Sequence, residues 1–204
     1  MGESSRHPLL ADTSSLIAVA NTDLWEEVTE SLVVTTTNVC KHELRNHVDA
    51  ASYPPEGSRE HYLEQGSQRV LDHLDNEESS FSCVTVVPRP HGADAGEQSL
   101  KQELTEHPEA YQVVSLLDSA ARRSIRRHVE DQDMDIDVVG PPYLLYVLLD
   151  NDLISKQEFC EATAEMIRTE GWTGYEVVKN AWTSIPVDCA DILDDDYDDI
   201  LPPN

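Results

Sequence analysis

The chain has 204 residues, 39% of them hydrophobic, and its 40 Asp and Glu against 14 Lys and Arg give a formal net charge of −26. This balance argues against a generic basic nucleic-acid-binding surface, although it leaves nucleic acid open as a ligand. Such a chain is either disordered, because high charge with few apolar residues marks disorder, or folded in concentrated salt, where charges are screened within ~3 Å at 1 M. Apolar runs such as YQVVSLL favour the folded, salt-adapted alternative and a halophilic source.

The first half of the chain is expected to alternate strands with helices. Apolar or β-branched runs predict strands at residues 8–12, 31–37 and 80–87. The spacing of apolar residues predicts helices at 14–21, 39–48 and 59–75, with a further amphipathic turn at 24–28. Asn38 is expected to cap the helix that follows it.

The second half continues the same alternation. A helix is predicted to begin at Glu97 and to end at His107-Pro108. The remaining elements are a central strand at 111–117, a helix at 119–130, a short strand at 135–140 and helices at 143–151 and 155–172. Ser155 and Glu158 have the spacing of a capping box.

Strands that alternate with helices predict a three-layer α/β/α sandwich with a mostly parallel sheet. We expect one domain at residues 8–172 and a C-terminal extension at 173–204 with a mobile, acidic tail. The apolar helices at 143–151 and 155–172 are expected to leave more apolar surface than one domain covers. A homodimer would cover that surface.

The cysteines give no sign of a structural metal. None has CxxC spacing, and Cys40 and His42, two residues apart, have poor geometry for zinc. The N-terminus is too short and polar for a signal peptide, and no apolar run approaches the ~18–20 residues of a membrane span. We therefore expect a cytoplasmic protein, with no membrane contact, whose reduced, partly buried thiols are Cys40, Cys83, Cys160 and Cys189.

Four acidic residues stand near strand ends and helix starts, where ligands of a parallel sheet gather. Asp12 and Asp118 each follow a predicted strand, and Glu43 and Glu97 lie on helices that follow strands. Sites in such sheets lie beyond the carboxyl ends of the strands. All four carboxylates can therefore share one edge of the sheet.

Crowded carboxylates repel one another, and a bound cation reverses that effect. Hard oxygen ligands select Mg²⁺ or Mn²⁺ rather than zinc. Mg²⁺ keeps several waters and binds only one or two carboxylates directly, so the others would hold its waters.

Each of these residues alone has a simpler explanation. Asp12 or Asp118 can be a helix cap, Glu97 a first-turn residue favoured by the helix dipole, and Glu43 a solvated helix residue. Arg122 can pair with an acid on its own helix. The joint arrangement of the four acids, rather than any one of them, favours a metal site.

Residues 8–172 resemble the PIN-domain nucleases. The resemblance lies in the run Asp-Thr-Ser-x-Leu at 12–16, the strand–helix segment at 36–44, the acidic segments and the Asp-x-Ala-Ala-Arg run within 96–123, and Val139-Gly140 before an apolar helix. It implies that Asp12, Glu43, Glu97 and Asp118 form a metal-binding catalytic quartet, with Ser14 and Arg122 near the site.

The resemblance also implies an activity and partners. The expected protein is a Mg²⁺- or Mn²⁺-dependent endoribonuclease that acts on single-stranded RNA. The family includes ribonuclease toxins of toxin–antitoxin pairs, so an antitoxin protein is a further candidate partner.

Two rivals stay open. A catalytically inert PIN-like binding or regulatory protein is favoured by the acidic surface and by Gly140-Pro141, where relatives often have a hydroxyl after the glycine. A receiver-like or nucleotide-binding module is the other rival, although the chain lacks a Gly-rich phosphate loop and a Lys at a strand end after Asp118.

The charge of −26 predicts that folding depends on screening by salt. Circular dichroism should show cooperative unfolding in molar KCl and a loosened fold in dilute buffer. A melting temperature that is the same in both solutions would contradict the halophilic interpretation.

Overall fold

Five parallel strands form the centre of the structure, a computed structural model that describes residues 8–50, 54–92, 94–170, 187 and 189. Their order across the sheet is β3-β2-β1-β4-β5. The strands are β1 (Leu9–Ala11), β2 (Val34–Thr37), β3 (Phe81–Val84), β4 (Val113–Ser115) and β5 (Asp137–Val139). The predicted parallel α/β sandwich is confirmed, and every pair of neighbouring strands is parallel.

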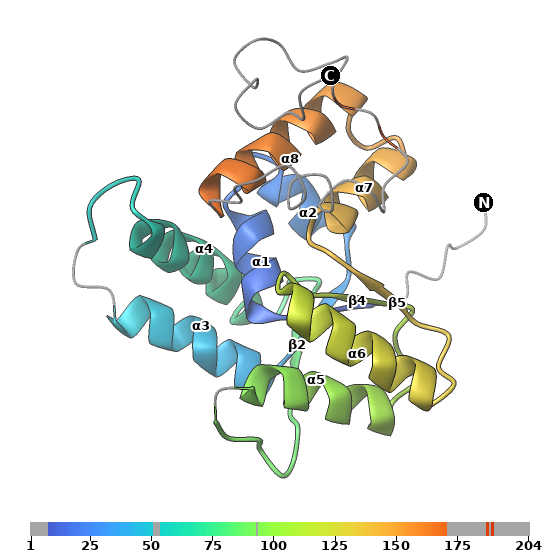
Figure 1. Cartoon of the computed structure of the whole chain (residues 1–204). Coiled ribbons are helices and arrows are strands. Elements are labelled where there is room, and N and C mark those ends of the chain that lie inside the picture. The colour runs from blue at the N-terminus through green and yellow to red at the C-terminus, as the bar shows by residue number, and fades with distance from the viewer. Residues whose placement is uncertain (1–7, 51–53, 93, 171–186, 188, 190–204) are drawn as a thin grey trace.

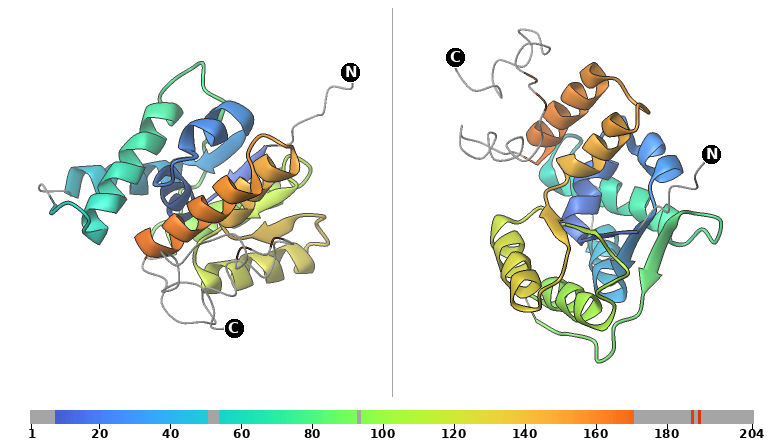
Figure 2. Two further views of the ribbon diagram at one scale, coloured as in Figure 1. Left: turned by 90° about the horizontal axis from the view of Figure 1, so that it is seen from above. Right: turned by 90° about the vertical axis from the view of Figure 1, so that its right-hand side faces the viewer.

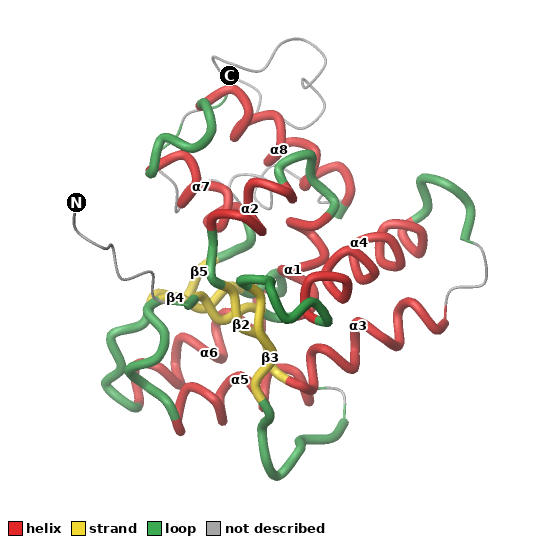
Figure 3. The backbone as a smooth tube through the Cα atoms, turned by 180° about the vertical axis from the view of Figure 1, so that it is seen from behind, coloured by secondary structure: helices red, strands yellow, loops and turns green. Residues whose placement is uncertain are grey.

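Helices cover both faces of this sheet (Figure 1). They are α1 (Thr13–Ala20), α2 (Trp25–Ser31), α3 (Asn38–Ala50), α4 (Arg59–Leu74), α5 (Ala95–Glu106), α6 (Ser119–Asp131), α7 (Pro142–Asp150) and α8 (Lys156–Thr169). Helices α5 and α6 lie side by side on one face, and α1, α2, α7 and α8 lie on the other (Figure 2). Helices α3 and α4 lie side by side near the β3 edge, as Figure 3 shows from behind.

The alternation of side chains along β1 divides the core between the two faces. Leu10 belongs to the cluster beneath α5 and α6, together with Leu100 and Ile125. Leu9 and Ala11 point to the opposite cluster, which also holds α1, α2, α7 and α8. All three β1 residues are buried, as expected for a central parallel strand.

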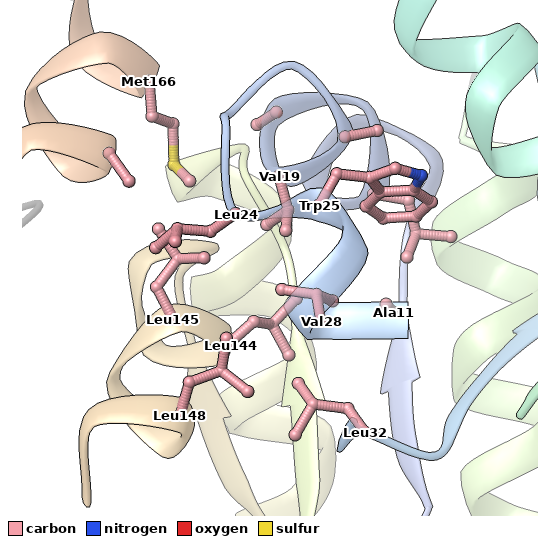
Figure 4. Close-up of a cluster of buried hydrophobic side chains, with 14 of the residues drawn as sticks. Ala11, Val19, Leu24, Trp25, Val28, Leu32, Leu144, Leu145, Leu148 and Met166 are labelled. Carbon is pink, nitrogen blue, oxygen red and sulfur yellow. The ribbon is translucent and has the colours of Figure 1, made fainter. Parts of the chain in front are cut away.

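The larger cluster explains the apolar helix near residue 145. Leu144, Leu145 and Leu148 of α7 are at most 1% exposed and face Leu24 and Val28 of the α2 region (Figure 4). Their burial stabilises the fold by about 25 cal/mol for each Å² of apolar surface removed from water. The apolar face of α7 therefore packs against other elements of its own chain.

The predicted elements all occur, with differences at their ends. The amphipathic turn at 24–28 is a full helix, α2, and the predicted strands are shortened to three or four residues. The prediction that Asn38 caps α3 was wrong. Thr37 Oγ1 accepts the hydrogen bond from the Cys40 amide, and Asn38 Oδ1 accepts one from the Val86 amide in the loop after β3.

The prediction of four reduced thiols was also wrong. Cys160 of α8 and Cys189 form a disulfide, and Cys40 and Cys83 are free. Cys160 lies on the buried face of α8, and Cys189 is 1% exposed beside it. The two cysteines have a sequence separation of 29, and no motif in the sequence predicts their pairing. Pairing depends on which cysteine the fold brings next to Cys160, and the spacing of cysteines along the sequence does not determine this.

The homodimer stays a prediction, but the described residues do not show the large exposed apolar surface on which that prediction was based. Among the residues placed by the structure, the only large hydrophobic side chains that are exposed are Val87 and Leu153. The expected mobile tail lies in 173–204, where only residues 187 and 189 are described. In the described part of the chain, no helix has the length and apolar character needed to cross a membrane.

Gly66 allows α4 to approach α1 closely. A Cβ at this position would lie 2.8 Å from Asn21 Nδ2, 2.9 Å from Ile17 Cγ2 and 3.0 Å from the Ile17 carbonyl oxygen. The carbonyl belongs to the backbone of α1 and cannot turn aside. The two helices must therefore separate to admit any side chain here.

Gly66→Ala should lower the free energy of unfolding by about 1–3 kcal/mol, the usual cost of overpacking. This loss outweighs the roughly 1 kcal/mol that alanine gains over glycine in a helix. Denaturant titration in molar KCl measures it. Gln68→Ala, at an exposed position of the same helix, is the control and should change the midpoint little. Equal or greater stability of Gly66→Ala would contradict the close packing of α1 against α4, because it would show that a Cβ fits between the two helices.

Candidate functional site

The four acidic residues lie at one edge of the sheet. Asp12 follows β1 and Asp118 follows β4, and these two strands are neighbours. Glu43 lies on α3 after β2, and Glu97 lies on α5 after β3. Chain connections leave β1 and β4 in opposite directions across the sheet, so their carboxyl ends form a topological switch point, where α/β proteins place ligands.

Asp12 is the most constrained of the four. Its Oδ1 accepts a hydrogen bond of 2.6 Å from the Ser15 amide and caps α1. Burial raises the pKa of Asp12 from 3.8 to about 7, and the nearby charge of Glu43 adds to the rise. Amides of Ser15 and Leu117, together with Arg122, act in the opposite direction but do not cancel it. The positive charge near Asp12 is therefore too small to stabilise its ionised carboxylate.

Glu43 is held next to Asp12 by a residue that directly follows Asp12. Thr13 Oγ1 donates a 2.6 Å hydrogen bond to Glu43 Oε2 and so joins α1 to α3. On its other side the carboxylate touches the first turn of α5. A Cβ on Gly96 would lie 3.1 and 3.2 Å from the two oxygens of Glu43. The glycine gives the carboxylate its space beside α5.

Glu97 is already paired. Its Oε1 accepts hydrogen bonds from Lys101 Nζ at 2.7 Å and from Ser124 Oγ at 2.6 Å. Burial acts to raise the pKa of Glu97, but these two hydrogen bonds outweigh it and the net pKa is lowered. Glu97 therefore stays ionised and ties α5 to α6.

Asp118 is the exposed member. Its Oδ1 caps α6 by accepting 2.8 Å hydrogen bonds from the amides of Ala120 and Ala121. Its Oδ2 accepts no hydrogen bond from any described residue. The cap fixes the direction of the carboxylate and leaves one oxygen for a ligand.

Arg122 supports the loop that carries Asp118. Its Nη1 donates hydrogen bonds to the carbonyls of Leu116 and Leu117, directly after β4. Asp118 and Asp12 both attract the guanidinium, yet burial lowers the pKa of Arg122 more than they raise it. Among the residues described, Arg122 makes no ion pair within 4.0 Å. The simpler alternative for Arg122, an ion pair with an acid on its own helix, is thus replaced by contacts to the backbone.

The acids form two electrostatic pairs rather than one cage. Asp12 interacts with Glu43, and Glu97 interacts with Asp118. In the part of the chain that the structure places, no three His, Cys, Asp or Glu side chains are close enough to hold a metal ion together. The donor set still fits a hydrated Mg²⁺ or Mn²⁺, because such an ion needs only one or two direct carboxylates. The raised pKa of Asp12 supports that fit, since a cation supplies the missing positive charge.

Several polar side chains that the sequence analysis did not single out hold the acidic residues in place. Ser14, predicted near the site, is exposed and donates no hydrogen bond to any described residue. Thr13 holds Glu43, and Ser15 Oγ lies 2.6 Å from Ser115 Oγ at the junction of β1 and β4. Spacing of four residues could have revealed the Glu97–Lys101 pair. Nothing in the sequence marks contacts between distant segments such as Thr13 and Glu43.

The Gly140-Pro141 departure lies close to this centre. A Cβ on Gly140 would be 3.6 Å from Arg122 Nη1. Pro141 is the residue before α7, which begins at Pro142. Arg122 therefore lies beside Gly140, and the residue that follows the glycine in this chain carries no hydroxyl.

Comparison with known protein families identifies a family for this chain. A family model described as "Halobacterial PIN domain" matches residues 1–199, nearly the whole chain. No curated protein and no solved structure matches. The matched range includes all four acids and Arg122.

The raised pKa of Asp12 predicts a pH-dependent cost to stability. The protonated carboxyl is favoured in the fold, so its contribution is fully present below the unfolded pKa near 4 and is lost as the pH rises through about 7. Asp12→Asn is neutral at every pH. Without metal, the variant should therefore be more stable than wild type at alkaline pH, by at most about 4 kcal/mol at about 1.4 kcal/mol per pKa unit.

Thermal melts in molar KCl with chelator, at about pH 5 and about pH 8, test this linkage. The gap between Asp12→Asn and wild type should widen toward the higher pH. Glu130→Gln, at an exposed position of α6, is the control and should show no such widening. A gap of the same size at both pH values would contradict the placement of Asp12 in a site short of positive charge.

Proposed function

The chain belongs to the halobacterial PIN-domain family, a nuclease-type fold, and from that premise we propose that its acidic edge is the centre of a metal-dependent ribonuclease. The proposed substrate is single-stranded RNA, and the proposed cofactor is Mg²⁺ or Mn²⁺. The reaction would be hydrolysis of a phosphodiester bond: water forms a new P–O bond, and the ribose oxygen leaves with a proton.

One observation carries the proposal. Asp12 is held at the topological switch point beside Glu43, and burial and repulsion raise its pKa to about 7. A fold that keeps a carboxyl group in such a place accepts an electrostatic cost, and perturbed groups of this kind gather at functional sites. A bound divalent cation would stabilise the ionised carboxylates and so remove this electrostatic cost.

The proposed roles follow from which oxygens are in use. Asp12 and Asp118 would contact the cation directly or through one water, since Asp118 Oδ2 is not used by the described residues. Glu43 and Glu97 would hold the remaining waters; Glu97 receives both of its hydrogen bonds on Oε1. When bound, the cation supplies a water of lowered pKa and positive charge for the leaving oxygen.

The supporting residues would keep these carboxylates in place. Thr13 orients Glu43, and Arg122 fixes the loop at 116–118 through its carbonyls. Ser14 is exposed at the first turn of α1, where it can reach a substrate phosphate. Loss of Thr13 or Arg122 would misplace the carboxylates rather than remove a reacting group.

A toxin role is a narrower proposal. It rests on the resemblance to ribonuclease toxins, and it would require an antitoxin protein as partner. A second candidate is the inert binding protein. The absence of a hydroxyl at Pro141 and of a three-carboxylate cluster among the described residues favours it.

Cleavage of single-stranded RNA in molar KCl, with Mn²⁺ or with excess chelator, tests the proposal. Wild type should cut RNA only with the cation. Asp12→Asn and Asp118→Asn should each lose activity by about 10–100-fold or more, as partners of a metal site do. Both should keep the circular dichroism spectrum of wild type.

Glu130→Gln removes an exposed acid of α6 outside the centre and should cut RNA like wild type. Cleavage that persists in chelator, or full activity in Asp12→Asn, would reject the mechanism. Binding of Mn²⁺ without any cleavage of RNA or DNA would favour the inert protein instead.

A further inference from the structure

Helix α6 concentrates the positive charge of a very acidic protein. Four of the chain's 14 Lys and Arg occur between residues 122 and 127. We call Arg122, Arg123, Arg126 and Arg127 the arginine strip. All four are arginines, the side chain whose planar guanidinium binds phosphate through two parallel hydrogen bonds.

The strip has an inner and an outer row. Arg122 and Arg126 turn toward the sheet, where Arg126 Nη2 donates a 3.1 Å hydrogen bond to the Val138 carbonyl of edge strand β5. Arg123 and Arg127, one turn apart, form the outer row. Arg123, Arg126 and Arg127 are exposed. From Arg122 to Arg127 the strip extends about 7.5 Å along the helix axis, with side-chain reach beyond that.

These cations form no ion pair within the described part of the chain. Other cations, such as Lys41, Arg45 and Lys101, do form ion pairs there. No described acid pairs with the strip, although the chain has 40 acidic residues. Arg59 and Lys156 also make no ion pair to described residues, so the strip is distinguished by density: four unpaired arginines lie within six residues of one helix.

Helix stability does not explain the strip either. Arg122 and Arg123 lie close to the N-terminus of α6, where the helix dipole disfavours cations. Burial lowers the pKa of Arg122; Asp118 and Asp12 act to raise it, and the like charges of Arg126 and Arg123 act to lower it. The four guanidinium groups thus lie near one another without an ion pair to a described acid, and a bound anion would offset their mutual repulsion.

The strip is continuous with the acidic centre. Asp118 caps the helix that carries it, and Arg122 interacts with both Asp118 and Asp12. Figure 1 shows α6 at the surface of the molecule beside α5. An anionic chain laid along α6 would therefore arrive at the proposed cation with its phosphates already bound.

We propose that the arginine strip binds the phosphate backbone of single-stranded RNA and guides it to the acidic centre. This inference rests on the proposed function and adds the surface that positions its substrate. Simple attraction is largely screened in molar salt, where the Debye length is ~3 Å at 1 M. Paired hydrogen bonds at short range survive that screening better than point charges do, which accounts for arginine here rather than lysine.

The test uses the outer row, which lies furthest from the centre. Binding of a fluorescein-labelled single-stranded oligoribonucleotide is followed by anisotropy across a range of KCl, in chelator so that no RNA is cut. Arg123→Gln with Arg127→Gln should raise Kd by about 10-fold or more, since the loss of one hydrogen bond to a charged group weakens binding by about that factor. The salt slope should fall by about 0.7 for each phosphate that the variant no longer binds.

Two further variants separate the strip from general charge. Arg59→Gln with Lys156→Gln removes the same charge from exposed positions of α4 and α8 and should leave Kd unchanged. Arg123→Lys with Arg127→Lys keeps the charge and loses the planar fork, so its Kd should lie between wild type and the Gln variant. With Mn²⁺, the Gln variant should cut RNA with a raised KM for the oligoribonucleotide, whereas Arg59→Gln with Lys156→Gln should keep the wild-type KM.

The outcomes distinguish this inference from the proposed function. If wild type binds RNA through the strip and cuts none, the ribonuclease proposal fails and the strip stands. If wild type cuts RNA while the Gln variant keeps its Kd and salt slope, the strip is rejected. If an oligo-aspartate peptide, rather than RNA, distinguishes wild type from the Gln variant, the strip serves an acidic protein segment and the inference is overturned.

Discussion

The charge on Asp12 is the constraint on which the rest of the site depends. The carboxyl group lies at the switch point of the sheet, where burial and Glu43 raise its pKa to about 7. Amides of Ser15 and Leu117 fix its direction without neutralising it. Because repacking cannot relieve this cost while the strands stay in place, the fold keeps a position that only protonation or a cation can satisfy.

The surrounding elements are fixed relative to that carboxyl group by specific polar contacts. Thr13 links α1 to Glu43 on α3, and Ser124 links α6 to Glu97 on α5. Arg122 holds the loop after β4 through backbone carbonyls. Helices from both layers therefore meet at one edge of the sheet, where the two acidic pairs and the start of the arginine strip come together. Catalysis and substrate positioning would use the same rigid frame.

Sequence patterns predicted the parallel sheet and the order of its elements, because strand and helix periodicity are local. They did not predict that Thr37 rather than Asn38 caps α3, that Cys160 pairs with Cys189, or that Thr13 holds Glu43. The last two depend on how segments far apart in the chain meet, and the first depends on the distant loop that draws Asn38 away from the helix end. Arginines 123 and 127 were visible in the sequence, but their exposure and the absence of ion pairs to described residues needed the fold.

Proton release on cation binding tests the central claim most directly. Titration calorimetry with Mn²⁺ in molar KCl, repeated in buffers of different ionisation enthalpy, measures how many protons leave as the ion binds. At about pH 6 wild type should release close to one proton, since Asp12 is then largely protonated, and release should vanish near pH 9. Asp12→Asn should release none at either pH. Binding without proton release at the lower pH, or the same release from Asp12→Asn, would contradict the account.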